Sequence, residues 1–463
     1  MRKETRKPSL IMSRFGVFLV LLILSLSACK VGRNFQGAEA EIEANYRNAS
    51  ESSEAKTILV SSDSLSPDSS VVSWQSLFPY PKLDSLIGQA LQHNQDVLIA
   101  LENIQQARYG LVVQRANMLP ALGGQMELRR GNFPGTVNGG VGENFLLTGG
   151  LQWELDFWGR LRRLNEAARA NIGREEANLR ALKLSLVSTV AEVYFQWLEF
   201  EQRLRIAEQT LAVRDSMLQK IELRFERGYV AEIDVNQAQI QRAIAAASVP
   251  LWQRLSNQSQ QSLAFLCGAP PRALHAQTTL TDLDTALHLP AGMPVDLIAR
   301  RPDILAAEQA LVAQNAQVGA AQANRLPQIS LTGLGGYRSG ELQNLNNGMS
   351  IWNFGAGLVM PIFNWNQLKR LVDIEKAQLM PAEWRYRQVV LNALVEVENS
   401  LIATETLQRE LKARAEHVAA AQRAEVLSLA RYDQGATSYL EYLESQRQSF
   451  NAQQEYAGTR RSC

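Results

Sequence analysis

Residue types that commonly perform catalysis are sparse in this 463-residue chain. Its cysteines and histidines are Cys29, Cys267 and Cys463, and His93, His275, His288 and His417. Three cysteines cannot build a disulfide framework, and no CxxC, HExxH or GxSxG motif accompanies them. Glu192 and Glu396 occupy matching helical segments and resemble a carboxylate pair, but a duplication also copies surface charges. The sequence therefore predicts no enzyme, no metal site and no cofactor.

Cys29 is the residue with the clearest chemical prediction. The basic segment Met1–Arg14 is followed by Phe15–Leu26, an apolar run of twelve residues that suits a signal peptide but is short for a membrane span. The sequence Leu-Ser-Ala-Cys then ends at Cys29, as in a bacterial lipobox. We expect residues 1–28 to be a lipoprotein signal peptide and Cys29 to be acylated; the alternative is an ordinary signal peptide with a chance cysteine. Lys30, rather than aspartate, follows Cys29, which favours sorting to the bacterial outer membrane.

The charge of the chain argues against a nucleic-acid partner. Lysine and arginine number 47 and aspartate and glutamate 46, which gives a formal net charge of +1. Nucleic-acid binding requires a clustered basic surface, and no such cluster is evident.

An internal duplication organises the chain. Several segments match at an offset of 207 residues: Ala116–Pro120 with Ala323–Pro327, Trp158 with Trp365, and Arg224–Gly228 with Arg431–Gly435. Between these segments we expect the register to shift, since Glu192 matches Glu396 best at an offset of 204. We expect a lipid-anchored tether over 29–80, a first repeat over 81–270, a linker over 271–290 and a second repeat over 291–463.

Each repeat contains two segments in which apolar and other residues alternate. These segments are 121–129, 147–156, 329–338 and 352–360. Their length of about 9–11 residues and their single apolar face fit transmembrane strands. Four strands cannot close a barrel, because about eight are the minimum, so the strands belong to a soluble sandwich or are pooled among several copies. The aromatic residues expected at the membrane interface are Trp153, Phe157, Trp158, Trp352 and Phe354.

Long helices follow the strands in both repeats. Asn165 to Gly228 contains no proline, and its apolar residues from Leu186 to Phe225 follow the 4-3 spacing of a coiled coil, with Arg214 as the exception. Lys369 to Gly435 has a looser pattern, and Leu83–Met118 is a further helical segment. Gly228 and Gly435 are expected to end the long helices in the left-handed conformation, so that each repeat folds back as a helical hairpin.

These segments resemble the TolC-like outer membrane factors, in particular their lipoprotein branch of the OprM type. The resemblance rests on Cys29 with Val31–Phe35, Trp74–Phe78 with Leu83–Ile87, Trp153–Gly159, Asp296–Ile304, and Gly435–Gln446. It implies an α+β membrane protein: a homotrimeric, 12-stranded β-barrel with four strands per chain, continued by a long periplasmic α-helical barrel. It also implies a passive, water-filled exit duct for small molecules, embedded in outer-membrane lipid. Its partners would be a periplasmic adaptor and an inner-membrane resistance-nodulation-division pump.

The resemblance also implies roles for residues near the hairpin tips. Leu440 and Glu444 match a periplasmic gate of a leucine and an acidic residue four positions apart, although related lipoproteins usually carry aspartate there. The alternative is that Glu444 is an ordinary solvated residue. Arg224 and Arg431, with Gly228 and Gly435, are candidate adaptor contacts; arginine in a last helical turn also suits the helix dipole, and both interpretations stay open.

Two other functions compete with small-molecule efflux. One is an exit duct for type I protein secretion, and the other is a periplasmic coiled-coil scaffold lipoprotein. The counterpart of Cys267 would lie beyond Cys463, so we also expect the second repeat to be truncated or frame-shifted near its end.

Overall fold

The computed structural model describes residues 30–37, 79–131, 142–274, 278–283 and 300–463. Cys29, the 1–28 leader, most of the expected tether and half of the 271–290 linker lie outside these residues. The chain divides into two compact units, and each contains segments of both repeats. We call residues 1–41, 101–178 and 301–390 the sheet unit, and residues 42–100, 179–300 and 391–463 the hairpin unit.

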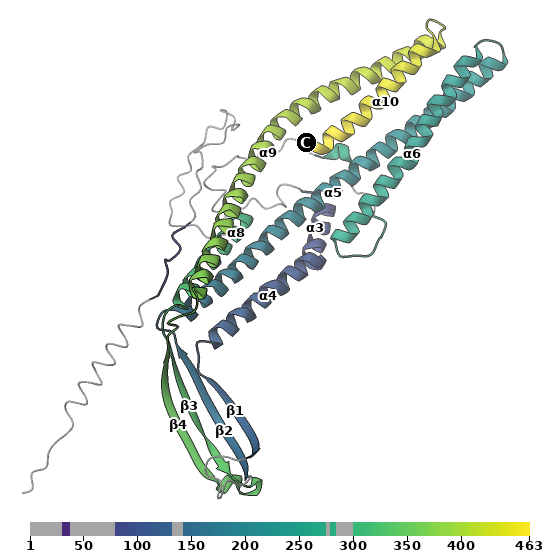
Figure 1. Cartoon of the computed structure of the whole chain (residues 1–463). Coiled ribbons are helices and arrows are strands. Elements are labelled where there is room, and N and C mark those ends of the chain that lie inside the picture. Colours follow the sequence, from purple (N-terminus) through teal and green to yellow (C-terminus); the bar gives the residue numbers. More distant parts are fainter. Residues whose placement is uncertain (1–29, 38–78, 132–141, 275–277, 284–299) are drawn as a thin grey trace, which may run out of the picture. The chain divides into compact units, whose positions relative to one another are not determined.

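The sheet unit contains one four-stranded antiparallel sheet in the order β1-β2-β3-β4 (Figure 1). Its strands are β1 (Ala121–Gly131), β2 (Gly142–Leu155), β3 (Gln328–Ser339) and β4 (Met349–Val359). The four strands expected from alternation are thus confirmed. Each repeat supplies one hairpin, and the two hairpins join where β2 pairs with β3.

The two faces of this sheet differ in chemistry. Directly paired residues of antiparallel strands share a face, so the register assigns every side chain to one side. One face carries Leu122, Met126, Leu147, Leu151, Leu331, Trp352, Phe354 and Leu358. The opposite face carries Gln125, Glu127, Asn144, Thr148, Gln152, Ser330, Thr332 and Asn353. The Phe354 ring covers Gly333, where an added Cβ would lie 3.0 Å from it, so glycine makes room for the aromatic ring.

Four helices continue the sheet unit: parts of α4 (Gln95–Ala116), α5 (Arg160–Glu226) and α9 (Gln367–Asp433), and all of α8 (Pro302–Ala323). The short helix η3 (Leu342–Asn347) connects β3 to β4. Four buried alanines, Ala167, Ala170, Ala313 and Ala316, form the contact between α5 and α8. Alanine permits a close approach of two helices because its side chain is a single methyl group.

The expected helix Leu83–Met118 is interrupted at Asn94, so this prediction is corrected to two helices, α3 (Pro81–His93) and α4. Asn94 has ψ 130°, which is extended. Its Oδ1 accepts hydrogen bonds from the backbone N–H groups of Asp96 at 2.9 Å and Val97 at 3.3 Å. Its Nδ2 donates to the Leu266 carbonyl at 3.0 Å. Asn94 is therefore an N-cap that starts α4 and fixes it to the last residue of α6 (Glu232–Leu266).

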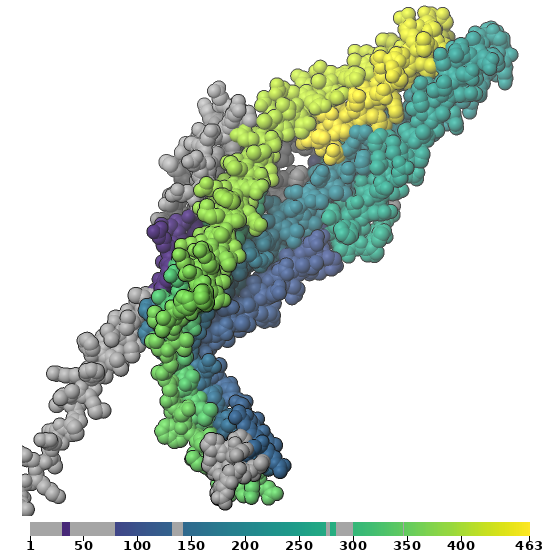
Figure 2. Space-filling view, viewed as in Figure 1, coloured from purple at the N-terminus to yellow at the C-terminus, as the bar shows by residue number. Residues whose placement is uncertain are grey.

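The hairpin unit contains α3, the distal parts of α5 and α9, and the returning helices α6 (Glu232–Leu266) and α10 (Tyr439–Ser462). Figure 2 shows α10 in yellow lying along α9. Between these two helices the hydroxyls of Ser428 and Ser445 are 2.8 Å apart, and Arg414 forms an ion pair with Glu455. The main apolar core of this unit includes Leu83, Ile87, Val190, Tyr194, Trp197 and Leu263.

The helix bounds keep the 207-residue offset throughout. α5 and α9 are each 67 residues long, and Arg160 and Gln367, at their starts, lie 207 positions apart. α6 and α10 begin at Glu232 and Tyr439, again 207 positions apart. The better match of Glu192 with Glu396 at 204 residues therefore does not reflect a difference in helix length.

Pro381 lies within α9, and Gly173 lies at the neighbouring position of α5. Among the described helices, none combines the length and the apolar character that a helical membrane crossing requires.

Candidate functional site

The aromatic residues predicted for the membrane interface form two groups. Trp352 and Phe354 lie on the apolar face of the sheet, 74% and 80% exposed, with ring centroids 6.2 Å apart. Trp153, Phe157 and Trp158 are half-buried where β2 leads into α5. Trp153 Nε1 donates to the Met118 carbonyl at 3.0 Å, and Trp158 Nε1 donates to the Pro327 carbonyl at 2.7 Å. These indoles fix the chain just before β1 and β3.

Lys30, the residue after Cys29, and the two residues that follow it contact Arg163 and Glu166 of α5. We call these two α5 residues the socket, and the sequence did not predict it. Arg163 has 0% exposure, and its guanidinium donates to the Val31 carbonyl at 3.0 Å and the Gly32 carbonyl at 2.6 Å. Glu166 forms ion pairs with Lys30 and Arg163. Burial raises the pKa of Glu166, but the hydrogen bonds and charges of Lys30 and Arg163 outweigh it and lower that pKa. The carboxylate is thus ionised and fixes Lys30 to α5.

Both hairpin tips have the same backbone geometry. After α5, Gly228 has φ 76° and donates to the Phe225 carbonyl at 2.8 Å, while Tyr229 donates to the Arg224 carbonyl at 2.9 Å. This pair of bonds is a Schellman motif with glycine in the left-handed position.

The tip after α9 repeats these bonds. Gly435 has φ 73° and donates to the Tyr432 carbonyl at 3.0 Å, and Ala436 donates to the Arg431 carbonyl at 2.9 Å. The predicted left-handed helix ends are therefore present in both repeats.

The two candidate tip arginines have partners within the chain. Arg224 lies over the Tyr432 ring, 4.8 Å from its centroid, and 3.6 Å from the Asp433 carboxylate. Arg431 lies 3.9 Å from Glu441. Both arginines join neighbouring segments of the tips, in addition to their place in the last helical turn.

A tyrosine cluster beneath the tips escaped the sequence analysis. Tyr432, Tyr439 and Tyr442 are buried with Ile221, and the ring centroids of Tyr432 and Tyr439 are 5.5 Å apart. Burial, with a smaller effect of Glu425, raises the pKa of Tyr442 to about 12, so its hydroxyl stays protonated at neutral pH. The spacing of Tyr439 and Tyr442 on one helical face was the available signal.

Leu440 and Glu444, the predicted gate residues, are both exposed near the start of α10. They are four positions apart and so lie on one side of the helix. Arg447 donates to the Glu444 carboxylate at 2.7 Å and 2.8 Å, and Gln448 donates to it at 3.0 Å. These hydrogen bonds, Arg447's first, lower the pKa of Glu444.

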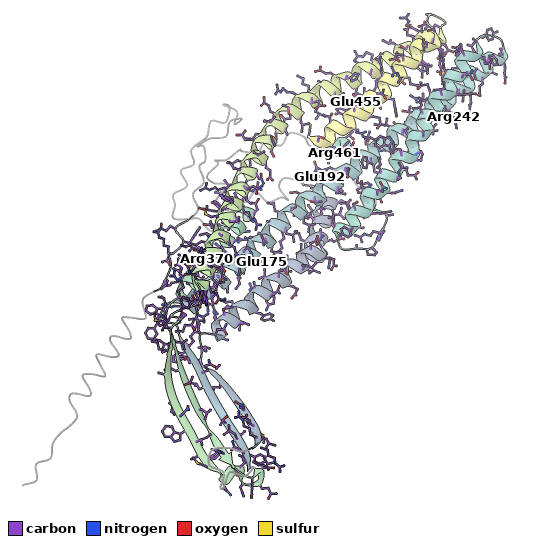
Figure 3. All side chains as sticks on the ribbon, viewed as in Figure 1. Glu175, Glu192, Arg242, Arg370, Glu455 and Arg461 are labelled. Carbon is purple, nitrogen blue, oxygen red and sulfur yellow. The ribbon has the colours of Figure 1, made fainter. Side chains whose placement is uncertain are left out.

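Other charged groups in the hairpin unit connect helices. Figure 3 labels Arg461, which forms an ion pair with Glu199 at 2.7 Å, and Arg242, which forms one with Asp215 at 2.6 Å. Glu192, labelled in the same figure, is exposed on α5. In the part of the chain that the structure describes, no three histidine, cysteine or carboxylate side chains gather as metal ligands.

Two features define the class of protein. One is a four-stranded sheet with an apolar face and two unpaired edge strands, and the other is the pair of long hairpins with matching tips. Together they indicate a subunit of a channel whose wall is shared among several chains. The outer membrane efflux protein family matches residues 86–269 and 293–463. The chain belongs to this family.

Individual relatives agree with this assignment. The antibiotic efflux pump outer membrane protein ArpC of Pseudomonas putida is 31% identical over 457 residues, covering 97% of this chain and 93% of ArpC. The cation efflux system protein CusC of Escherichia coli K12 is 32% identical over 385 residues, covering 82% of this chain and 83% of CusC. A crystal structure of a membrane protein from Pseudomonas aeruginosa has a TM-score of 0.84 at 28% identity, covering 94% of this chain and 97% of that one.

The family confirms the predicted class of function. The chain is an outer-membrane efflux channel and not an enzyme, and as in the family three copies form the channel. Efflux, rather than a periplasmic scaffold, is therefore its role.

Proposed function

We propose that the chain is the lipid-anchored exit duct of a tripartite efflux system for small molecules, closed at its periplasmic end by Leu440 and Glu444. The observation that carries the proposal is the conjunction of a two-faced sheet with a pair of hairpins whose tips share one backbone geometry. The apolar face, with Trp352 and Phe354, contacts outer-membrane lipid. The polar face, with Gln125, Asn144 and Thr332, lines the water-filled pore.

Cys29 is the lipid attachment site in this proposal. Its sequence context predicts acylation, and the socket around Lys30 supports it, because adjacent Cα atoms lie only about 3.8 Å apart. The acyl chains would then enter the bilayer beside the first residues of the sheet unit. Two acyl chains add a stable membrane anchor.

The hairpin tips dock the periplasmic adaptor, which connects the duct to an inner-membrane resistance-nodulation-division pump. Gly228 and Gly435 have open space beside their Cα atoms, so a partner can approach the backbone closely. Arg224 and Arg431 order the tips through Asp433 and Glu441. The names of the relatives support small-molecule cargo, because ArpC is named for antibiotics and CusC for cations.

Single-channel recording tests the gate. Replacing Leu440 and Glu444 together by alanine removes three leucines and three carboxylates from the axis of a trimer, so we expect a higher conductance. Leu427→Ala with Glu416→Ala, at exposed positions of α9, is the matched control and should leave conductance unchanged. Equal conductance of the gate variant and the wild-type channel would remove both residues from the gate.

A further inference from the structure

A pocket in the sheet unit lies close to the points where α4 leads into β1 and β2 leads into α5 (Figure 1). It is lined by the end of α4, the start of α5, part of α8 and Lys30, and it has a volume of about 590 Å³. Sites for small molecules have volumes of about 300–1,000 Å³, so a small polar group fits here. We call it the basic pocket, and its polar lining includes Lys30, Arg115, Arg162, Asn165, Glu166 and Arg169.

Two of the four cations in the basic pocket have carboxylate partners in the folded chain. Lys30 forms an ion pair with Glu166, which also pairs with Arg163. Arg162 pairs with Asp156 at 3.2 Å. The single carboxylate of the pocket lining is therefore already occupied by two cations.

The other two cations, Arg115 and Arg169, have no such partner. Both are exposed, and neither side chain forms an ion pair or a hydrogen bond with a residue that the structure describes. A guanidinium group presents parallel N–H donors that match the oxygens of a phosphate group. The basic pocket thus offers two unpaired guanidinium groups to an anion.

Asn165 adds an unsatisfied hydrogen-bond acceptor to the basic pocket. It is only 5% exposed, and its Nδ2 contacts Met118 Sδ at 3.2 Å. Its Oδ1 accepts no hydrogen bond from the described residues. Buried side-chain oxygens are rarely left without a donor. A hydroxyl group of a bound molecule would supply this donor, whereas a bound cation would be repelled by the arginines.

The basic pocket lies beside the end of the apolar face of the sheet. Met118, which lines the pocket, accepts a hydrogen bond at its carbonyl from Trp153 Nε1 at 3.0 Å. Trp153 is paired with Leu331 and so belongs to the apolar face. In the proposed function this face contacts lipid, and tryptophan is enriched at the depth of the lipid headgroups. The phosphate groups of phospholipids are the anions at this depth.

We propose that the basic pocket binds the headgroup of an anionic glycerophospholipid that carries hydroxyl groups, such as phosphatidylglycerol. Arg115 and Arg169 pair with the phosphodiester oxygens, and Asn165 accepts a hydrogen bond from a headgroup hydroxyl. Phosphatidylethanolamine fits less well, because its ammonium group would enter a pocket that already holds four cations. The inference rests on the proposed lipid contact of the apolar face, and it is independent of the gate and of acylation at Cys29.

Native mass spectrometry of full-length trimers in detergent, with phosphatidylglycerol added, tests this site. We expect the wild-type trimer to retain one lipid per subunit. Arg115→Gln with Arg169→Gln should weaken binding about 30-fold, which corresponds to about 1 kcal/mol for each basic residue near a membrane surface. Phosphatidylethanolamine with the same acyl chains should be retained less than phosphatidylglycerol.

Arg385→Gln with Arg387→Gln is the matched control. It removes the same charge from exposed positions of α9 in the sheet unit that do not line the pocket, so it should leave lipid retention unchanged. Equal retention by the Arg115→Gln and Arg169→Gln double variant and the wild-type trimer would overturn the proposal.

Asn165→Leu tests the hydroxyl contact, because leucine has a similar size but no acceptor. Loss of one hydrogen bond should weaken binding of phosphatidylglycerol about two- to tenfold and leave binding of phosphatidylethanolamine unchanged. A leucine variant with the full preference for phosphatidylglycerol would exclude Asn165 from the site.

Inorganic phosphate distinguishes a lipid site from a site for a free anion. An excess of inorganic phosphate should leave phosphatidylglycerol bound, since the acyl chains add contacts that phosphate lacks, and its release would overturn the assignment to lipid. The conductance of the same trimers in lipid bilayers separates this inference from the proposed function. Trimers that conduct but retain no phosphatidylglycerol would refute the lipid site alone, whereas a wild-type chain that never enters a bilayer would refute the exit duct.

Discussion

Arg214 interrupts the apolar seam of α5, and in the hairpin unit it is only 3% exposed. It donates to the Gln241 carbonyl at 2.6 Å and lies 5.5 Å from the Phe450 ring centroid, but its Nε has no partner among the described residues. Burial lowers the pKa of its guanidinium. These contacts therefore compensate for only part of the free-energy cost of removing this cation from water.

This balance predicts opposite outcomes for two substitutions of Arg214. Arg214→Leu restores the 4-3 pattern and should leave the melting temperature unchanged or raise it, because apolar replacement of a buried ion is often neutral or stabilising. Arg214→Ala leaves a cavity and should cost about 2–4 kcal/mol. Thermal unfolding followed by circular dichroism distinguishes them. A leucine variant as unstable as the alanine variant would show that Arg214 is needed for its charge.

If Glu444 belongs to the gate, the conductance of the channel should change with pH only in the acid range, where this carboxylate becomes protonated. We call this change the acid transition. Arg447 and Gln448 hold its pKa below the ordinary value of 4.5. A lowered carboxyl pKa means that the ionised form is favoured in the folded protein, so its stabilising interaction is present above the unfolded pKa and is lost as the pH falls through the folded one. Within one subunit the Glu444 charge should therefore persist until the pH is below 4.5, whereas mutual repulsion of three such carboxylates near one axis would raise the pKa.

Arg447→Gln should shift this acid transition to higher pH, because it removes the cation that favours the carboxylate. Single-channel conductance recorded against pH measures the shift. Glu444→Gln is the control and should abolish the transition. A midpoint that stays the same in Arg447→Gln would mean that the ion pair does not form in the assembled channel.

Some candidate site residues could be proposed from the sequence because their signal is local. Leu440 and Glu444 stand in one helical segment, and the aromatic residues of the strands follow a period of two. The socket of Arg163 had no local signal, because its acceptors at Val31 and Gly32 are more than 130 positions away. The tertiary fold alone brings these groups together.

At the scale of elements, the two tip turns give a prediction that tests their equivalence. Gly228 and Gly435 have φ 76° and 73°, and an added Cβ would meet nothing within 4 Å at either position. Alanine there is disfavoured only by the backbone conformation, which costs about 1–2 kcal/mol. Gly228→Ala and Gly435→Ala should therefore lower stability by similar amounts, and any departure of the double variant from their sum measures the coupling of the two tips through Arg224 and Asp433.

Chemical denaturation of the three variants measures this additivity. Asparagine tolerates the left-handed region better than alanine, so Gly228→Asn should recover part of the loss. A loss at one tip much larger than at the other would indicate that the tips are not equivalent.

The elements themselves were largely predictable, and the exception shows why. The apolar residues of the strands and long helices recur with periods of 2 and 3.5 over many residues, and these periods predict the elements. Glycine predicts the helix ends. The break at Asn94 was missed because asparagine also fits a helical pattern. What decides its role as a cap is the Leu266 carbonyl, 172 positions away, which fixes its side chain.

At the scale of the whole molecule, the number of strands carries the argument for assembly. A four-stranded sheet leaves β1 and β4 as edges with unpaired backbone groups, which cannot be placed in lipid. The sequence alone left a soluble sandwich as an alternative, because alternation occurs there too. Membership of the outer membrane efflux protein family resolves this choice.

The barrel and the proposed lipid anchor are two separate attachments to the membrane, and this predicts what happens when one is lost. Cys29→Ser should abolish incorporation of labelled fatty acid but leave a heat-modifiable trimer, because the apolar face of three sheets stays in the bilayer whether or not the acyl chains are present. The measurement combines metabolic labelling with gel migration of boiled and unboiled samples. Arg163→Ala is the complementary variant: it should keep the label, since the lipobox is intact, while it removes the hydrogen bonds that hold the Val31 and Gly32 carbonyls to α5. A Cys29→Ser protein that still incorporates label would place acylation elsewhere, and one that no longer forms trimers would show that the anchor is required for assembly.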